Sequence, residues 1–516
     1  MLRLLIILMI MACLPIKAEE IGIVVDINDS EISAKYDEET QLFIFRGIPF
    51  AKPPIGELRW KSPVSIEPPK AIDARIFKPA CMQDTYSTEG YHDVIESFDQ
   101  DTSMFEHVES VSEDCLYLNI WTTSIDSSKK KPVMVWIYGG NDVGGWTYEP
   151  NYLGHHLAQK DVVVVSIPYR LNIFGFFNHP EMENQTGNFG LEDEILALEW
   201  VKENIAQFGG DPENITLFGE SAGGAHVSYH IASPLSEGLF DRGIIQSGGY
   251  NLSKPGRLNT VEDANKLALK TQNIAGAINL GELEQLSAKD ILAISSNLYH
   301  PYHPIVDGKL IPDNITKIFN EGVLNDVDVM IGSNKNEDLL YVDENPKLED
   351  FSKLIAWYHP NKVDEILGML DLSDLRMAID RFGTNQDTAC PSILIARSMA
   401  RTGNHVYQYF FARERENSGK ILAYHGAEIP YVFNTHDEFL PTTEEDLILT
   451  QQMMEYWTQF AKKGTPNSFD NPVTWYEFGK EENYLILDTE VKNDKKLESQ
   501  FCDIMIEGLT QKASSK

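Results

Sequence analysis

Positively charged residues are scarce in this chain. Its 516 residues include 43 Lys and Arg against 78 Asp and Glu, which gives a formal net charge of −35 and an isoelectric point near 4.7. A strongly acidic chain repels phosphate backbones and anionic lipid headgroups. We therefore exclude nucleic acids and anionic membrane surfaces as partners. The apolar fraction of 42% is ordinary for a globular protein and allows a large core.

Long apolar runs are also lacking, with one exception at the N-terminus. Arg3 precedes an apolar run over residues 4–14, and Ala18 ends the short segment that follows. This order predicts a cleaved secretory signal over residues 1–18, because the run is short for a membrane span. An uncleaved anchor is the alternative. We expect a secreted, extracellular protein that passes through the endoplasmic reticulum, with no transmembrane anchor in the mature chain.

Cysteine is rare too, with five residues in the whole chain. Cys13 belongs to the predicted signal, which leaves Cys81, Cys115, Cys390 and Cys502. An even number of cysteines in an oxidising compartment predicts two disulfides. Three pairings are possible, and the order of the cysteines in the sequence favours none of them.

Five Asn-x-Ser/Thr sequons agree with a secretory route. We expect glycans on surface loops at Asn28, Asn184, Asn251 and Asn314. The fifth sequon, at Asn214, lies close to a predicted strand, so it is the one least expected to carry a glycan.

Apolar runs and helical patterns alternate through the middle of the chain. Residues 132–138 and 162–167 are continuous apolar runs, which are typical of strands buried on both faces. Strands that alternate with helices predict an α/β fold, with a large mixed, mostly parallel sheet flanked by helices. Further strands are predicted at 244–248, 327–332 and 406–411, a helix at 190–204, several short helices over 267–298, and an amphipathic helix at 447–462.

The N-terminal part of the chain has a different pattern. Residues 21–45 alternate in short runs, which predicts a small antiparallel β-meander. Residues 80–115 form a long polar stretch with little periodicity, and we expect a surface loop there. No repeat, linker or low-complexity tract divides the remainder, so residues 19–516 are predicted to form a single domain.

A serine turn stands between a predicted strand and a predicted helix. The segment Gly219-Glu220-Ser221-Ala222-Gly223 follows an apolar run and has the form G-x-S-x-G. In this setting the pattern predicts a nucleophile elbow, which presents a serine hydroxyl at a sharp, crowded turn. Glycines on either side of Ser221 leave room for the neighbouring strand and helix.

A nucleophilic serine needs a base and an acid that orients the base, and in α/β-hydrolases these follow in the order Ser, Asp or Glu, His. Glu337 follows the predicted strand 327–332, and His425 follows the predicted strand 406–411. We expect His425 to accept the proton of Ser221 and Glu337 to stabilise the imidazolium. The chain has 13 histidines, and the alternative is that His425 is one of its structural ones.

Backbone amides near the serine turn are candidates for an oxyanion hole. Ala222 follows the nucleophile directly, and the turn Gly139-Gly140-Asn141 follows a buried strand. Amides from these two places converge on the substrate oxygen in α/β-hydrolases. The alternative is a plain turn at the end of a strand.

Several longer motifs resemble the type-B carboxylesterases of the cholinesterase-like family, which have the α/β-hydrolase fold. The resemblance covers essentially the whole mature chain. The residues that carry it are 45–51 (FRGIPFA), 112–121 (SEDCLYLNIW), 136–140 (WIYGG), 208–212 (FGGDP), 218–224 (FGESAGG) and 425–433 (HGAEIPYVF).

The resemblance implies a serine carboxylesterase that hydrolyses small-molecule carboxylic esters through an acyl-enzyme, with no metal or cofactor. It implies Ser221, Glu337 and His425 as the catalytic triad. It also implies three oxyanion positions, three buried polar residues that support the site, and two disulfides. The oxyanion positions are Gly140, Asn141 and Ala222. The supporting residues are Glu220, Ser247 and Glu428, and the disulfides are Cys81–Cys115 and Cys390–Cys502.

Two departures from the family pattern stand out. The family turn has three glycines, and here the third is Asn141. Asn tolerates a positive φ, but its side chain takes up space near the acyl carbon, so we expect lower or altered activity. The position that carries the choline-stacking tryptophan in cholinesterases is Phe105. Fewer aromatic faces weaken the binding of a quaternary ammonium, which favours neutral esters over choline esters.

Two other functions remain as alternatives. Some proteins of this fold are catalytically weak or inactive adhesion and binding proteins, and Asn141 keeps that possibility open. A lipase acting on aggregated lipid would need an apolar lid, whereas residues 81–115 are rich in Asp and Glu.

Overall fold

The computed structural model of the protein describes residues 21–27, 30–108, 110–183, 186–252, 258–299 and 301–514. The predicted signal and two of the predicted glycan sites, Asn28 and Asn184, lie outside these ranges. Within them, no helix is both long and apolar enough to cross a membrane.

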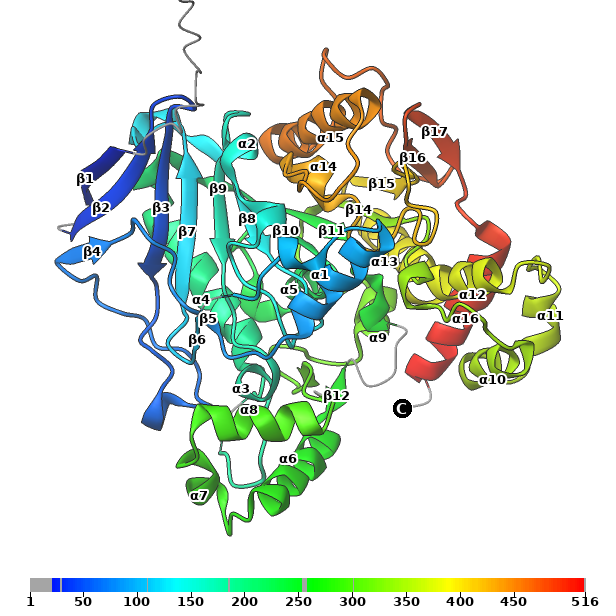
Figure 1. The fold of residues 1–516 in the computed structure, drawn as a ribbon, viewed down its shortest axis with the longest axis horizontal. Helices are drawn as coiled ribbons and strands as arrows, with labels where there is room; N and C mark the ends of the chain where they lie inside the picture. The colour runs from blue at the N-terminus through cyan, green and yellow to red at the C-terminus, as the bar shows by residue number, and fades with distance from the viewer. Residues whose placement is uncertain are drawn as a thin grey trace, which may run out of the picture.

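One large sheet organises the described part of the chain. In spatial order its strands are β1 (Ile21–Ile27), β2 (Ser30–Asp37), β3 (Leu42–Pro49), β7 (Tyr117–Thr122), β9 (Val163–Ile167), β8 (Lys131–Ile137), β10 (Gly210–Glu220), β11 (Arg242–Gln246), β14 (Asp328–Asn334), β15 (Val406–Phe411), β16 (Asn483–Leu487) and β17 (Lys492–Lys495), with β4 (Ala71–Asp73) beside β2. From β9 to β16 all neighbours are parallel. Antiparallel strands complete both edges (Figure 1). The predicted α/β fold is confirmed.

Burial explains why the central strands are continuous apolar runs. Every side chain from Val133 to Ile137 in β8 is fully buried, and β9 is buried along its whole length. Parallel strands covered on both faces have no exposed side that needs polar residues. The predicted N-terminal meander is present as β1, β2 and β3, and it forms one edge of the main sheet.

Helices pack against this sheet and form lobes beyond it. Helices α4 (Phe189–Asn204), α5 (Ala222–Ala232), α13 (Cys390–Thr402) and α15 (Glu444–Lys463) contact the central strands. Helices α6 (Val261–Ala275), α7 (Leu280–Glu284) and α8 (Ala288–Asn297) gather at one end of the molecule (Figure 1). They account for the several short helices predicted over residues 267–298. Apart from α1 (Tyr86–Ser97), the other described α-helices are α2 (His155–Ala158), α3 (Asn172–Gly175), α9 (Ile315–Glu321), α10 (Leu348–Tyr358), α11 (Val363–Leu367), α12 (Leu375–Gly383), α14 (Ile429–Phe433) and α16 (Ser499–Ser514).

One sequence prediction in the N-terminal part is wrong. The stretch 80–115, expected to be a loop, contains the helix α1 (Tyr86–Ser97). Its apolar stripe is short, with Tyr91, Val94 and Ile95 in the second half of the helix, Gly90 lies in its middle, and only Thr88 and Ile95 of the helix are buried. Tertiary contacts override the weak local propensity here.

Both disulfides implied by the family resemblance are present. Cys81 bonds to Cys115, and Cys390 bonds to Cys502. The first closes the segment that contains α1, and the second ties α13 to α16. Of the remaining sequons, Asn251 lies in a 3₁₀ turn, Asn314 caps α9, and Asn214 lies inside β10.

Strand ends bring polar residues to one edge of the sheet. The parallel strands β8, β10, β11 and β14 end at neighbouring positions, because their registers pair Gly219 with Ile137 and Gln246 with both Glu220 and Gly332. In open α/β sheets, ligands bind in the crevice outside the carboxyl ends of the strands.

Candidate active site

The serine turn has the strained geometry that its sequence predicts. Ser221 lies between β10 and α5 with φ 54° and ψ −121°, and its N–H donates to the carbonyl of Gln246. A Cβ on Gly219 would lie 2.5 Å from the carbonyl carbon of Gly223, and one on Gly223 would lie 2.1 Å from the carbonyl oxygen of Ile137. Glycine is therefore required on both sides of the serine.

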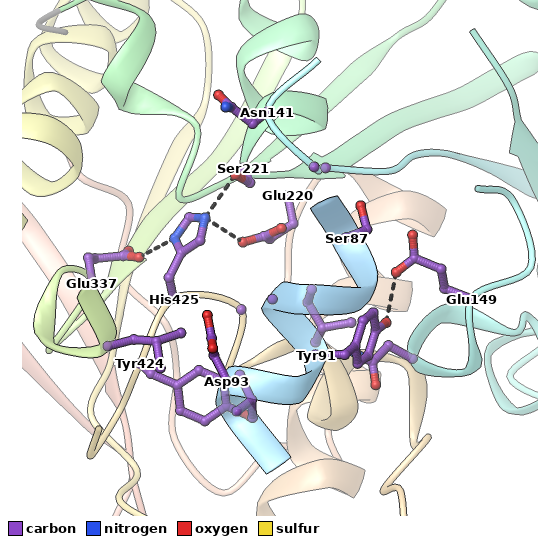
Figure 2. Close-up of a pocket in the computed structure, with 18 of the residues that line it drawn as sticks. Ser87, Tyr91, Asp93, Asn141, Glu149, Glu220, Ser221, Glu337, Tyr424 and His425 are labelled. Atoms are coloured by element: carbon purple, nitrogen blue, oxygen red, sulfur yellow. Dashed lines mark hydrogen bonds and ion pairs between the residues drawn. The ribbon is translucent and has the colours of Figure 1, made fainter. Parts of the chain in front are cut away.

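Ser221, His425 and Glu337 form one continuous chain of hydrogen bonds. The Nε2 of His425 lies 2.8 Å from the Oγ of Ser221, and its Nδ1 lies 2.6 Å from the Oε2 of Glu337 (Figure 2). Ser221 follows β10, Glu337 follows β14, and His425 lies in the loop after β15. The fold therefore joins three residues that the sequence singled out separately.

The carboxylate of Glu337 is held by donors on its other oxygen. Its Oε1 accepts hydrogen bonds of 2.7 Å from the Oγ of Ser247 and from the N–H of Asn334. The side chain is 2% exposed. These bonds fix the orientation of Oε2 toward His425. Ser247 thus lies where the sequence prediction required a supporting residue.

Glu220 and Glu428 are two further buried carboxyl groups beside the triad. The Oε1 of Glu220 lies 3.3 Å from the Nε2 of His425, and burial raises the pKa of Glu220 to about 8. Glu428 accepts hydrogen bonds from the side chains of Asn334 and Gln246, and burial raises its pKa as well. Burial alone would lower the pKa of His425, but the carboxylates beside it outweigh that effect and raise the pKa above its ordinary value.

Asn334 and Gln246 were missed by the sequence analysis. Asn334 joins the two carboxyl groups, since its N–H donates to Glu337 and its Nδ2 donates to Glu428. Gln246 donates to Glu428 and accepts from the indole of Trp457. Each is the last residue of a buried strand, and a polar residue ending an apolar run was the signal that could have found them.

The candidate oxyanion amides lie next to the serine. Gly140 has φ 93° and Asn141 has φ 62°, and a Cβ on Gly139 would lie 3.0 Å from the Cβ of Ser221. Ala222 is fully buried as the first residue of α5, so its amide has no acceptor within the helix. Figure 2 shows Asn141 beside Ser221, on the side away from His425.

These groups open into a cavity of about 480 Å³. Helix α1, the element that the sequence did not predict, supplies one wall of it (Figure 2). The described lining residues include no Lys or Arg. The carboxyl groups among them belong to Glu89, Asp93, Glu149, Glu220, Glu337, Asp338 and Asp387.

Phe105 does not line this cavity. Its ring stacks on Tyr91 of α1, with the centroids 3.9 Å apart and the planes 11° apart. Tyr91 lines the cavity in its place, and its hydroxyl donates to the buried carboxyl group of Glu149. The aromatic ring that faces the cavity near Phe105 is therefore that of Tyr91, and its hydroxyl is already hydrogen-bonded to Glu149.

No metal site is evident. Among the described residues, no group of three or more His, Cys, Asp or Glu is placed to hold an ion.

Comparison with known proteins connects this geometry to a family. Residues 24–505 match the carboxylesterase family. The chain belongs to that family. Carboxylesterase 1E of Mus musculus is 32% identical over 518 residues, which cover 91% of this chain and 90% of the mouse protein. The enzyme is therefore a carboxylic ester hydrolase, as the sequence predicted.

Other relatives span different activities within the family. The acetylcholinesterase of Bungarus fasciatus is 32% identical over 503 residues, covering 89% of this enzyme and 81% of its own chain. A medium-chain fatty acyl-CoA hydrolase precursor of Anas platyrhynchos is also 32% identical, and the match covers 92% of this enzyme and 90% of the duck protein. The names of these relatives therefore do not by themselves identify the ester that this enzyme hydrolyses.

Solved structures agree with the fold. A carboxylesterase of Geobacillus stearothermophilus superposes on the enzyme with a TM-score of 0.80 at 28% identity, covering 93% of this chain and 99% of that chain. A thermophilic pNB esterase gives a TM-score of 0.81 at the same identity and coverage. The enzyme has the α/β-hydrolase fold of these esterases.

Proposed function

We propose that this enzyme is a secreted serine carboxylesterase that works through an acyl-enzyme, with Ser221 as nucleophile, His425 as general base and acid, and Glu337 as the acid that orients the imidazole. The observation that carries the proposal is the unbroken pair of hydrogen bonds from Ser221 through His425 to Glu337. A serine hydroxyl becomes a useful nucleophile when an adjacent base takes its proton.

The geometry supports an ordinary two-step acyl transfer. The Oγ of Ser221 bonds to the ester carbonyl carbon while its proton moves to the Nε2 of His425. The C–O bond to the alcohol then breaks, and His425 returns the proton to the leaving oxygen. Water, deprotonated by the same imidazole, attacks the acyl-enzyme and releases the carboxylic acid and the free serine.

The amides of Gly140, Asn141 and Ala222 stabilise the negative oxygen in both steps. The turn that holds the first two lies against Ser221, and the third begins α5, whose positive dipole end points the same way. Fixed donors of this kind act on charge that develops only in the transition state, so they raise kcat more than they lower KM.

Secretion rests on three observations that agree with one another. The N-terminal pattern is that of a signal over residues 1–18, and four cysteines form two disulfides, which is typical of oxidising compartments. Sequons at Asn28, Asn184, Asn251 and Asn314 remain proposed glycan sites. We propose that residues 19–516 form one domain, since the main sheet takes strands from both ends of the chain.

The cavity favours short neutral esters as substrates. Its volume of about 480 Å³ lies in the range of small-molecule sites, and its carboxyl-rich lining without Lys or Arg repels anionic acyl or alcohol groups. Phe105, at the choline-stacking position, is covered by Tyr91, which argues against a choline ester. The inactive binding protein and the lipase are not favoured, because the triad is complete and α1 presents polar residues to the cavity.

Hydrolysis of a panel of esters tests this proposal. The purified mature chain is expected to hydrolyse p-nitrophenyl acetate and butyrate, and to prefer both over acetylthiocholine and over a p-nitrophenyl hemisuccinate. The comparison uses kcat/KM for each ester. A folded protein that hydrolyses none of these esters contradicts the proposed function, and a preference for the hemisuccinate contradicts the role given to the acidic lining.

Replacing Asn141 with glycine is expected to raise kcat by about tenfold, because it removes a side chain that narrows the space around the acyl carbon. If obstruction is the cause, the gain grows from p-nitrophenyl acetate to hexanoate, since a longer acyl chain meets the side chain more severely. Steady-state kinetics on the acyl series measures this. A collapse of kcat for every ester would show instead that the Asn141 side chain is used in the reaction.

Replacing Glu220 with glutamine is expected to move the acid limb of the pH profile of kcat/KM to lower pH, by about one to three pH units. His425 accepts a proton only when neutral. Burial raises the pKa of Glu220, but the charged imidazolium at 3.3 Å favours the ionised carboxylate, and that carboxylate in turn stabilises the imidazolium and raises the pKa of His425. Removing that carboxylate lowers the pKa of His425, so the active form persists at lower pH. Glu220→Asp is the control that keeps the charge. An unmoved limb, or one moved to higher pH, contradicts this assignment.

A further inference from the structure

The candidate oxyanion turn contains two consecutive residues in a conformation that favours glycine. After Gly140, Asn141 has φ 62° and Asp142 has φ 64°. Residues other than glycine rarely adopt this backbone conformation, and two such residues in succession persist only where surrounding contacts hold them. The turn must therefore be fixed by contacts beyond its own backbone.

The side chain of Asp142 supplies such contacts. It is buried, and its Oδ1 lies 2.9 Å from the Nε2 of His226, while its Oδ2 lies 2.9 Å from the Nδ1 of His303. His226 belongs to α5, the helix that begins directly after Ser221, and His303 lies just before the short strand β13 (Ile305–Val306). The carboxylate thus ties the turn to the helix behind the nucleophile.

His226 lies between two carboxylates. Its Nδ1 is 2.7 Å from the Oε1 of Glu194 in α4, and its Nε2 contacts Asp142. Ionised carboxylates only accept hydrogen bonds, so both ring nitrogens must donate and the ring is an imidazolium. Burial alone would lower the pKa of His226, but the two carboxylates outweigh burial and raise it well above its ordinary value. The ring of Tyr169 lies 4.9 Å from the imidazolium.

Further polar groups surround this cluster. The other oxygen of Glu194 lies 2.7 Å from the Nε2 of His230, whose Nδ1 contacts the hydroxyl of Ser236. The next residue toward the start of α4, Asp193, forms its own buried pair with Arg170. The cluster consists of Asp142 and Glu194 with His226 between them, and His303 and His230 lie at its two ends. Breaking one member of such a buried cluster leaves an uncompensated charge.

We propose that Asp142 and His226 are positioning residues for ester hydrolysis: their buried ion pair fixes the Gly140–Asp142 turn against α5, so that the amides of Gly140 and Asn141 stay aligned with the amide of Ala222. The inference rests on the proposed function and adds residues that touch neither the substrate nor the triad. The turn backbone is also held by the N–H of Asn172, which donates to the carbonyl of Asp142 over 2.6 Å. The N–H groups of Val143 and Gly144 donate to the carbonyl of Gly140 as well. These bonds hold the two ends of the turn, so without the ion pair the Asn141 peptide between them can rotate.

Asp142→Asn and His226→Gln test the proposal through the transition state. In Asp142→Asn, the new amide NH₂ faces the N–H of either His226 or His303, so two donors meet. In His226→Gln, the positive charge between Asp142 and Glu194 is removed. We expect kcat per titrated active site to fall by about 10- to 100-fold, because small misplacements of reacting groups cost rates of this order. KM is expected to change by no more than about threefold. The Ki of an aryl trifluoromethyl ketone, whose serine adduct carries the oxyanion, should rise by the same factor as kcat falls.

His230→Gln is the matched control. It removes a histidine from the same helix and the same cluster, yet His230 does not touch the turn. We expect it to lower the melting temperature and leave kcat per active site and the ketone Ki within about twofold of the wild type. A purely structural role of the cluster would give all three variants the same pattern, namely reduced stability with unchanged kinetics per site. That pattern overturns the proposal.

His303→Gln decides the case if the two central variants do not fold. It loosens one of the two bonds to Asp142 near the edge of the cluster, and it is expected to raise the ketone Ki severalfold. An unchanged Ki contradicts the positioning role. The kinetics of the wild type separate this outcome from failure of the proposed function. A wild type that neither hydrolyses esters nor binds the ketone contradicts the proposed triad. An active wild type with unaffected variants contradicts only the positioning role.

Discussion

Replacing His425 with alanine is expected to lower kcat for p-nitrophenyl butyrate by about 10⁵- to 10⁶-fold. The imidazole is the only group within hydrogen-bonding distance of the Ser221 hydroxyl that can take its proton, among the contacts in the described part of the chain. The measurement is single-turnover and steady-state hydrolysis of enzyme freed from traces of wild type. The melting temperature verifies that the fold survives.

The same loss is expected when Ser221 and His425 are both replaced. Residues that act as a unit are not additive, because the second substitution removes nothing that still works. The double variant Ser221→Ala/His425→Ala should therefore be about as slow as either single variant. Losses that multiply in the double variant would mean that the two side chains act independently, and that His425 is not the base for Ser221.

Replacing Glu337 with glutamine is expected to lower kcat by about 10⁴-fold. The two donors on Oε1, from Ser247 and Asn334, will hold the oxygen of the new side-chain amide in that position. The amide NH₂ then faces Nδ1 of His425 and donates to it. This selects the tautomer with the proton on Nε2, which cannot accept the proton of Ser221.

Glu337→Asp is the control that keeps the negative charge but changes the position of the carboxylate. It keeps the carboxylate but withdraws it by one methylene group, so it should retain more activity than Glu337→Gln. The distinguishing measurement is kcat at pH values above the acid limb, where the imidazole is neutral in every variant. A Glu337→Gln enzyme within about tenfold of the wild type would contradict the orienting role of this residue.

The serine turn was predictable because its geometry is local. Gly219 and Gly223 have no alternatives, since a Cβ on either would overlap the backbone of a neighbouring segment. The strands were predictable because central parallel strands are buried on both faces, which leaves a continuous apolar run in the sequence. The chain order and the strand ends made Glu337 and His425 candidates, and the resemblance to the family then singled them out among many acidic residues and histidines.

Other parts of the site depend on contacts that leave little trace in the sequence. Helix α1 has only a short apolar stripe and a glycine in its middle, so its helical form depends on its place at the cavity wall between two bonded cysteines. The covering of Phe105 by Tyr91 follows from that helix and could not be predicted without it. The sequence alone therefore predicted the serine turn but not the helix that forms one wall of the cavity.

The buried ion cluster is the clearest case of this limit. Its members come from the turn after β8, from α4, from α5 and from the segment before β13, and each could be an ordinary hydrogen-bonded core residue when taken alone. His226 lies on a helix of small and apolar residues, where a histidine is usually a hydrogen-bonded core residue. Only the fold shows that Asp142 and Glu194 approach it from opposite sides.

Active-site labelling tests the central claim most directly. The mature enzyme is treated with a fluorophosphonate, digested, and analysed by mass spectrometry, in parallel with Ser221→Ala. We predict one phosphonyl adduct, on the peptide that contains Ser221, with loss of ester hydrolysis in proportion to labelling and no adduct in the variant. An adduct on another residue, or labelling that persists in Ser221→Ala, would contradict the assignment of this serine as the nucleophile.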